Sequence, residues 1–210
     1  DWERRYEEGL TRICMRAEWS ASETRCILLQ SLVQVAGARR ALEIGSFCGV
    51  GALALAEALP ESAEVVALEF DDFCVEFGRR FQARSTSGHK IHTTLGKICD
   101  SLPNLARRAR LGLEAPFDFV VIDADKEGMQ QYFDLVWGTP GLLSDCGVVC
   151  VDMTPFKGQR PVGYAKFGFP YRWQASSGEA QIDALRSTVE ASPSFAAHEF
   201  AGLLVVGRAA

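Results

Sequence analysis

Short apolar runs alternate along this chain with longer segments in which apolar residues recur at helical spacing. A run of about four to eight apolar residues between glycine, proline or acidic residues is typical of a buried strand, whereas recurrence at about every third or fourth residue is typical of an amphipathic helix. Strands are therefore predicted at residues 41–44, 65–68, 90–95, 117–122 and 148–151, followed by a hairpin of residues 197–200 and 203–206. Helices are predicted at residues 2–17, 26–35, 52–59, 72–84, 101–111, 129–137 and 178–191.

The order of these elements predicts the fold class. Strands and helices that alternate in this way form a parallel sheet with helices on both faces. We therefore expect an α/β, Rossmann-like, doubly wound sheet of seven mostly parallel strands that closes with an antiparallel C-terminal hairpin. Ser20 precedes Glu23 by three residues and is expected to cap the second helix.

The stretch 41–69 has the order strand, glycine turn, helix, strand and acid. This order is typical of the nucleotide-binding half of a doubly wound sheet. Glycine lets a backbone approach a ligand closely. Glu69, at the end of the second strand, is placed to accept hydrogen bonds from two ribose hydroxyls.

The spacing of the glycines narrows the choice of nucleotide. It is Glu43-x-Gly45-x-x-x-Gly49-x-Gly51, whereas a dinucleotide fold has Gly-x-Gly-x-x-Gly. The pattern resembles the first motif of S-adenosylmethionine (SAM) methyltransferases, in which Glu43 would hold the cationic amino end of the cofactor. The alternative is a generic strand-turn-helix that binds another nucleotide.

Composition and charge bound the class of protein. A chain of 210 residues is one domain, or one domain with an extension. Its net charge of −5 argues against a nucleic-acid partner, and no apolar run reaches the roughly 18 residues of a membrane span. The seven cysteines are odd in number and include no Cys-x-x-Cys pair, which is typical of a reduced, cytoplasmic protein. No signal peptide is visible, and because the chain begins at Asp1 it could be cut from a longer polypeptide.

Acidic residues lie at or near the carboxyl ends of the predicted strands, where open α/β sheets bind ligands. They are Glu43, Glu69, Asp123, Asp125 and Asp152. Asp123 and Asp152 could share a hard divalent cation such as Mg²⁺, which prefers oxygen ligands. Lys126 would then lie beside the metal with a lowered pKa and could serve as a general base. The alternative for Lys126 is a surface lysine at a helix start.

The segment 154–177 differs from the rest of the chain because it is rich in proline, glycine and aromatic residues. A loop of this length is usually functional or disordered, and its aromatic content favours an ordered wall around the substrate. A structural flap is the alternative. The two predicted N-terminal helices, within residues 1–37, are expected to cover the cofactor or to form a subunit contact, as in a homodimer.

Three segments make the resemblance to a known family specific. They are residues 42–60, residues 117–126 with the sequence Phe-Asp-Phe-Val-Val-Ile-Asp-Ala-Asp-Lys, and residues 147–152. With these segments the chain resembles, over nearly its whole length, the cation-dependent O-methyltransferases of the caffeoyl-CoA and catechol type. Residues 67–77 and 88–91 are further similar to the desmethyl-4-deoxygadusol O-methyltransferases of mycosporine biosynthesis.

This resemblance implies a set of site residues. The implied SAM site is made of Glu43, Gly45, Ser46, Gly51, Glu69, Phe70, Gly96, Lys97, Ile98, Asp123 and Asp125. Within it, Glu69 would hold the ribose and residues 96–98 would frame the adenine. Asp123 and Asp152 would bind the metal, and Asp123 and Lys126 would be the catalytic residues, with Lys126 as the candidate base.

The chain departs from the family pattern at Met153, where the family has an asparagine whose carbonyl is a metal ligand. A thioether is a soft ligand and a poor partner for Mg²⁺. Either water completes a weak metal site, or another loop residue substitutes, or catalysis needs no metal. Lys97 also stands where the family tends to have a smaller residue.

The function expected from these observations is SAM-dependent methylation of a hydroxyl on a small molecule. A metal chelated by two neighbouring oxygens would lower the pKa of the hydroxyl and hold it in line with the methyl group. The expected substrate is therefore a catechol, an enediol or a vicinal hydroxy-ketone. The alternatives are a metal-independent methyltransferase on the same scaffold and an inactive SAM-binding partner subunit. A nicotinamide dehydrogenase is the weakest alternative, because the glycine spacing is wrong for it.

Overall fold

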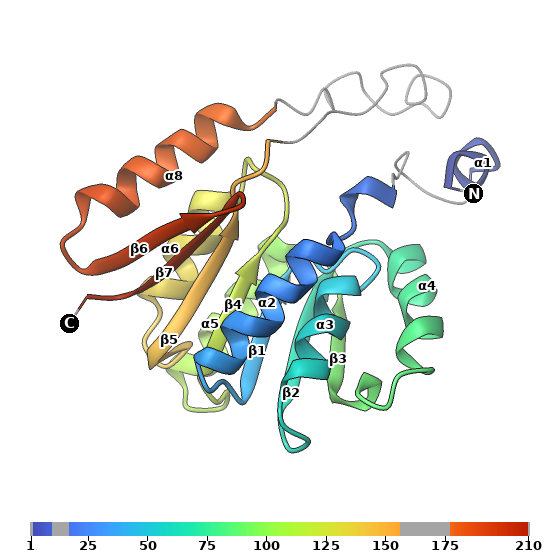
Figure 1. The fold of residues 1–210 in the computed structure, drawn as a ribbon, viewed down its shortest axis with the longest axis horizontal. Helices are drawn as coiled ribbons and strands as arrows, with labels where there is room; N and C mark the ends of the chain where they lie inside the picture. The colour runs from blue at the N-terminus through green and yellow to red at the C-terminus, as the bar shows by residue number, and fades with distance from the viewer. Residues whose placement is uncertain (1, 10–16, 156–176, 210) are drawn as a thin grey trace.

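The computed structural model describes residues 2–9, 17–155 and 177–209. Within them the strands form one seven-stranded sheet in the order β3-β2-β1-β4-β5-β7-β6 (Figure 1). The strands are β1 (Arg40–Ile44), β2 (Glu64–Glu69), β3 (Ile91–Leu95), β4 (Phe117–Ile122), β5 (Leu143–Asp152), β6 (Phe195–Phe200) and β7 (Leu203–Arg208). Strands β1 to β5 pair in parallel, and β7 pairs antiparallel with both β5 and β6. The predicted doubly wound α/β sheet with an antiparallel C-terminal hairpin is confirmed.

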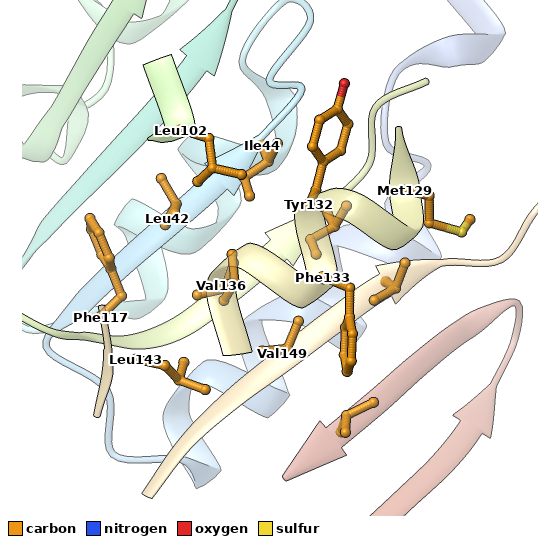
Figure 2. Close-up of a cluster of buried hydrophobic side chains, with 14 of the residues drawn as sticks. Leu42, Ile44, Leu102, Phe117, Met129, Tyr132, Phe133, Val136, Leu143 and Val149 are labelled. Atoms are coloured by element: carbon orange, nitrogen blue, oxygen red, sulfur yellow. The ribbon is translucent and has the colours of Figure 1, made fainter. Parts of the chain in front are cut away.

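Helices cover both faces of the sheet. In the described residues they are α1 (Trp2–Glu7), η1 (Ala17–Trp19), α2 (Glu23–Val35), α3 (Val50–Ala58), α4 (Asp72–Gln82), η2 (Gly88–Lys90), α5 (Ile98–Arg110), α6 (Met129–Gly138) and α8 (Glu179–Ala191). Because side chains alternate along a strand, each face receives its own core. Helices α2 and α3 pack against Ala41 and Phe119. Helices α5, α6 and α8 pack on the other face, around Leu42 and Phe133 (Figure 2).

The start of the chain differs from the prediction. Helix α1 ends at Glu7, residues 10–16 lie outside the described part, and η1 begins at Ala17. Ser22, not Ser20, caps α2, and its Oγ accepts a hydrogen bond from the backbone N–H of Arg25 at 3.2 Å. Glu23 is the first residue of the helix, so it does not hold the third helical position that a capping box requires.

Strand β5 begins at Leu143 rather than at the predicted residue 148, because it runs through residues 145–147 as one long strand. Phe117 pairs with Leu143 and Phe119 with Val148, so the extra residues of β5 are taken up as an irregularity in its pairing with β4. None of the helices in the described residues combines the length and apolar character needed to cross a membrane.

The carboxyl ends of β1, β4 and β5 lie next to one another. Ile44 pairs with Ile122, and Ile122 pairs with Val151. The backbone N–H of Asp123 continues this pairing by donating to the Ile44 carbonyl oxygen at 2.9 Å. The glycine turn after β1 therefore lies at the same edge as Asp123 and Asp152, as parallel strands require.

Candidate functional site

The glycine loop packs too closely against its neighbours to carry side chains at two positions. Gly45 has φ +88°, and a Cβ atom there would lie 2.3 Å from the backbone oxygen of Asp123. A Cβ atom on Gly51 would lie 2.0 Å from Oε1 of Glu43. Phe47, between them in the loop, has a positive φ of 50°, which is uncommon for a bulky residue. The loop is thus held in one conformation over the ends of β1 and β4.

Glu43 lies beneath this loop and is buried. Burial raises the pKa of Glu43 to about 8, while a hydrogen bond from Ser46 opposes the rise and the charge of Asp123 adds to it. Its Oε2 atom is buried and accepts no hydrogen bond from the described residues. A buried acceptor without a partner is unfavourable by about 1–3 kcal/mol. The position is therefore suited to a cationic group supplied by a ligand.

Glu69 joins the glycine loop to the end of β2. Its Oε2 accepts a hydrogen bond from the backbone N–H of Phe47 at 2.6 Å, and its Oε1 accepts from Phe70 at 2.8 Å and Asp71 at 2.9 Å. Burial raises the pKa of Glu69, although these backbone hydrogen bonds oppose the rise. A carboxylate has about four acceptor positions, so the group can still accept from a ribose hydroxyl.

The residues predicted to frame the adenine lie next to Glu69. The backbone N–H of Gly96 donates to the Glu69 carbonyl oxygen at 2.8 Å. Lys97 is the N-cap residue of α5, and Ile98 is its buried first residue. Phe70 is 43% exposed at the same edge. The structure thus brings the predicted SAM-contacting residues of three successive strand ends together, and their contact with a cofactor stays a prediction.

Asp125 has a structural role that the sequence did not indicate. Its Oδ1 accepts from the backbone N–H of Gly128 at 2.6 Å, and its Oδ2 accepts from the Tyr132 hydroxyl at 2.7 Å. The burial of Tyr132 and its bond to Asp125 raise the pKa of that phenol. Asp125 therefore fixes the start of α6, whatever its contact with a ligand.

Lys126 is buried, in contrast to the alternative of a surface lysine. Its Nζ donates to Asp152 twice, to the backbone oxygen at 2.6 Å and to Oδ2 at 2.8 Å. Gly178 closes over the stem of this side chain, since a Cβ atom there would lie 2.4 Å from the Cβ of Lys126. Lys126 is thereby held in place between the ends of β4 and β5.

Arg25 is the site residue that sequence reasoning missed. It comes from the first turn of α2, and its Nη2 donates to Oδ1 of Asp152 at 2.8 Å. Burial raises the pKa of the nearby Asp123 carboxyl, and the charge of Asp152 raises it further, whereas the charges of Lys126 and Arg25 oppose the rise. A cation in the first turn of a helix is disfavoured by the helix dipole. This unfavourable position was the one sign in the sequence that Arg25 is held by a partner outside its helix.

The predicted metal site can be tested against these contacts. Asp152 Oδ1 accepts from Arg25 and from the Thr154 hydroxyl, and its Oδ2 accepts from Lys126. Met153 is buried in the core that α5, α6 and α8 form on the sheet. The part of the chain that the structure describes holds no group of three or more His, Cys, Asp or Glu residues suited to a metal ion.

Charge decides how well a dication would fit. An ion bound to Asp152 Oδ1 at about 2.1 Å would lie within about 5 Å of Arg25 Nη2, because the nitrogen is 2.8 Å from that oxygen. Charges of +2 and +1 at that separation repel by about 7 kcal/mol at an effective dielectric constant of about 20. The donors described here therefore do not fit a hard dication unless Arg25 is displaced.

A cavity of about 210 Å³ adjoins this cluster, lined by Ser22, Thr24, Arg25, Leu28, Thr154 and Ala201. The predicted substrate loop 154–177 also begins here. Its residues 156–176 lie outside the described part of the chain, so the choice between a substrate wall and a flap stays a prediction.

The fold and the site together define a class of protein. A glycine loop after β1, acids along the carboxyl edge and β7 inserted antiparallel between β5 and β6 make up the class I methyltransferase fold. A family model described as O-methyltransferase matches residues 6–161. The chain belongs to this family, which confirms the resemblance derived from its motifs.

Curated relatives agree with this assignment. Tricin synthase 1 of Oryza sativa subsp. japonica is 41% identical over 116 residues, which are 55% of this chain and 45% of that protein. A probable caffeoyl-CoA O-methyltransferase 1 of Dictyostelium discoideum is 30% identical over 128 residues, 61% of this chain and 53% of that protein. The catechol O-methyltransferase of Niastella koreensis is 31% identical over 126 residues, 59% of this chain and 55% of that protein. The chain spans about half the length of the curated relatives it matches.

Solved structures share the fold over nearly all of the chain. The O-methyltransferase TomG of Streptomyces achromogenes, described as involved in tomaymycin synthesis and in complex with SAM, gives a TM-score of 0.73 at 22% identity, covering 100% of this chain and 87% of that one. An O-methyltransferase of Bacillus cereus, in complex with SAH, gives a TM-score of 0.72 at 23% identity, covering 98% of this chain and 88% of that one. At these identities the similarity shows the fold alone.

Proposed function

We propose that this chain is a SAM-dependent O-methyltransferase that acts on a hydroxyl of a small molecule with a second oxygen next to it, such as a catechol, an enediol or a vicinal hydroxy-ketone. The observation that carries the proposal is the buried, unpaired Oε2 of Glu43 beneath the glycine loop. An ammonium group would satisfy it, and Glu69 lies at the neighbouring strand end for the ribose. The family and the names of the relatives support the same reaction. A cytoplasmic location and a homodimer belong to this proposal as expectations.

The residues of the chain divide the chemistry between them. When bound, SAM would supply an activated methyl group for the substrate oxygen, and its sulfur would keep the electron pair of the bond that is broken. Lys126 Nζ, as the neutral amine, would take the proton of the hydroxyl. Asp152 positions that nitrogen through two hydrogen bonds. The glycine loop positions the cofactor, so that the acceptor oxygen and the methyl group are aligned.

Metal assistance is the part of the expected mechanism that the donor set supports least. Asp152 is engaged by Arg25, Lys126 and Thr154, and the adjacent Met153 offers no hard ligand. These contacts favour the metal-independent alternative on the same scaffold. The direct test is incubation with methyl-labelled SAM and a panel of catechols, enediols and hydroxy-ketones, with and without a chelator. Absence of transfer to every member of the panel would refute the proposal.

Replacing Glu69 by alanine is expected to weaken SAM binding by about 1–3 kcal/mol, because charge-assisted hydrogen bonds to the ribose are lost. Isothermal titration calorimetry with SAM measures the change. Glu76→Ala is the matched control, since Glu76 is an exposed acid on α4. Unchanged affinity in a folded Glu69→Ala protein would show that this acid serves only to hold the glycine loop.

SAM binding at pH 7 is expected to release close to one proton from Glu43. The pKa of Glu43 is about 8 in the free protein, so the carboxyl is mostly protonated at pH 7. A bound ammonium stabilises the carboxylate and lowers this pKa, so the proton leaves on binding. Titrations in two buffers with different ionisation enthalpies count the protons. Glu43→Gln should abolish the release, and equal release from both proteins would assign it to another group.

A further inference from the structure

Arg25 is bound to the end of β5 more extensively than a surface ion pair would be. Its Nη2 donates to Asp152 Oδ1 at 2.8 Å and lies 3.4 Å from the carbonyl oxygen of Ala201 and 3.3 Å from that of Gly202. Its side chain is 13% exposed. The guanidinium therefore crosses from α2 to the β6–β7 turn at the edge of the sheet where the site lies.

The guanidinium also has an unused donor. Its Nη1 atom is buried and donates no hydrogen bond to any residue that the structure describes. Arg25 lines the cavity of about 210 Å³ together with Thr154, whose hydroxyl donates to the same Asp152 oxygen at 2.8 Å. A cation with a free donor, a hydroxyl and a cavity thus meet beside the Asp152 carboxylate that positions Lys126.

The position of Arg25 is unfavourable for the helix that carries it. The N-terminus of α2 has a partial positive charge, and an acid rather than a base is stabilising there. Asp152, at the end of a strand 127 residues further along the chain, compensates for this. The placement is explained by the site rather than by the helix.

We propose that Arg25 takes the place of a metal ion in this site: its guanidinium binds the charged oxygen that neighbours the acceptor hydroxyl. The substrate class is a vicinal oxyanion, such as a catecholate or the enolate of a hydroxy-ketone. The Nη1 of Arg25 carries two N–H donors that no described residue accepts, so they are available to the charged oxygen of such a pair. The inference rests on the proposed function for its substrate, but its first test does not.

The first test measures metal binding without turnover. Mn²⁺ is titrated into the wild type, Arg25→Ala, Met153→Asn and the double variant, and free Mn²⁺ is followed by electron paramagnetic resonance. We expect no saturable site in the wild type, and in the double variant an affinity at least about tenfold above that of either single variant. Saturable binding to the wild type that is lost in Asp152→Asn would overturn the inference.

The second test measures substrate binding. Arg25→Gln should raise KM for a vicinal-oxyanion substrate by about 10- to 100-fold and leave the Kd for SAM within about twofold, whereas Arg25→Lys should restore part of the loss. Gln34→Ala, an exposed change on the same helix, is the control. An unchanged KM in a folded Arg25→Gln protein would overturn the inference. If Arg25→Gln does not fold, the KM of Arg25→Lys, which keeps the charge, is compared with that of the wild type. A raised KM would support the inference, and an unchanged KM would overturn it. If the wild type methylates no member of the panel, the proposed function fails, and the Mn²⁺ titration still decides the role of Arg25.

Discussion

Replacing Lys126 by methionine is expected to lower kcat by at least about 100-fold, the scale on which a positioned general base acts. The Kd for SAM should change by no more than about twofold, because Glu43 and Glu69, which are expected to hold its amino end and its ribose, lie at the ends of β1 and β2. The reason for the large effect is geometric. Lys126 Nζ is fixed by two hydrogen bonds to Asp152. A water molecule in its place would not be held in the same position. Methionine fills a similar volume without a proton acceptor.

The measurement combines single-turnover rates across pH with SAM titrations. Asp152 keeps Arg25 as a partner in the variant, so its charge is not left unpaired. Glu127→Ala is a suitable control, because Glu127 is the exposed neighbour of Lys126. A variant that matches the wild type at every pH would assign Lys126 a purely structural role, as a bridge between the ends of β4 and β5.

The strands could be predicted from the sequence to within one or two residues, except that β5 begins at Leu143 rather than at residue 148. Most are apolar runs that stop at glycine or at an acid, so their limits can be found in the local sequence. The helix starts were predicted less well, because they depend on the backbone that precedes them. α5 begins at Ile98 rather than at Ser101, directly after the turn in which Gly96 bonds to the end of β2. The cap of α2 was misplaced for a similar reason.

The acids of the site could be predicted because a parallel sheet collects the carboxyl ends of its strands at one edge. The side chains and backbone groups that bind these acids could not be predicted. Asp125 was assigned to the ligand, yet its two oxygens accept from Gly128 and Tyr132. A cation in the first turn of α2 marks Arg25 as unusual, but the sequence does not show that it reaches Asp152, since that contact depends on how α2 packs against the sheet.

The second prediction with a large effect concerns Gly45. Gly45→Ala is expected to lower the free energy of unfolding by about 2–4 kcal/mol and to weaken SAM binding by more than about tenfold. A positive φ is unfavourable for alanine by about 1–2 kcal/mol. In addition, the new Cβ would lie 2.3 Å from the backbone oxygen of Asp123, which cannot rotate away as a side chain could. The loop must therefore lift from β4, which moves Glu43 and Asp123 apart.

Gly112→Ala separates the two contributions. Gly112 has φ +67°, close to that of Gly45, but a Cβ atom there would meet nothing within 4 Å. Gly112→Ala should therefore lower the free energy of unfolding only by the cost of the positive φ, about 1–2 kcal/mol, and leave SAM binding unchanged. Chemical denaturation gives the stabilities and calorimetry gives the affinities. Equal losses of stability for the two variants would mean that the contact with Asp123 relaxes at little cost. In that case Gly45 would be needed for its backbone conformation alone, and the close packing of the loop on β4 would not be what holds the cofactor site in shape.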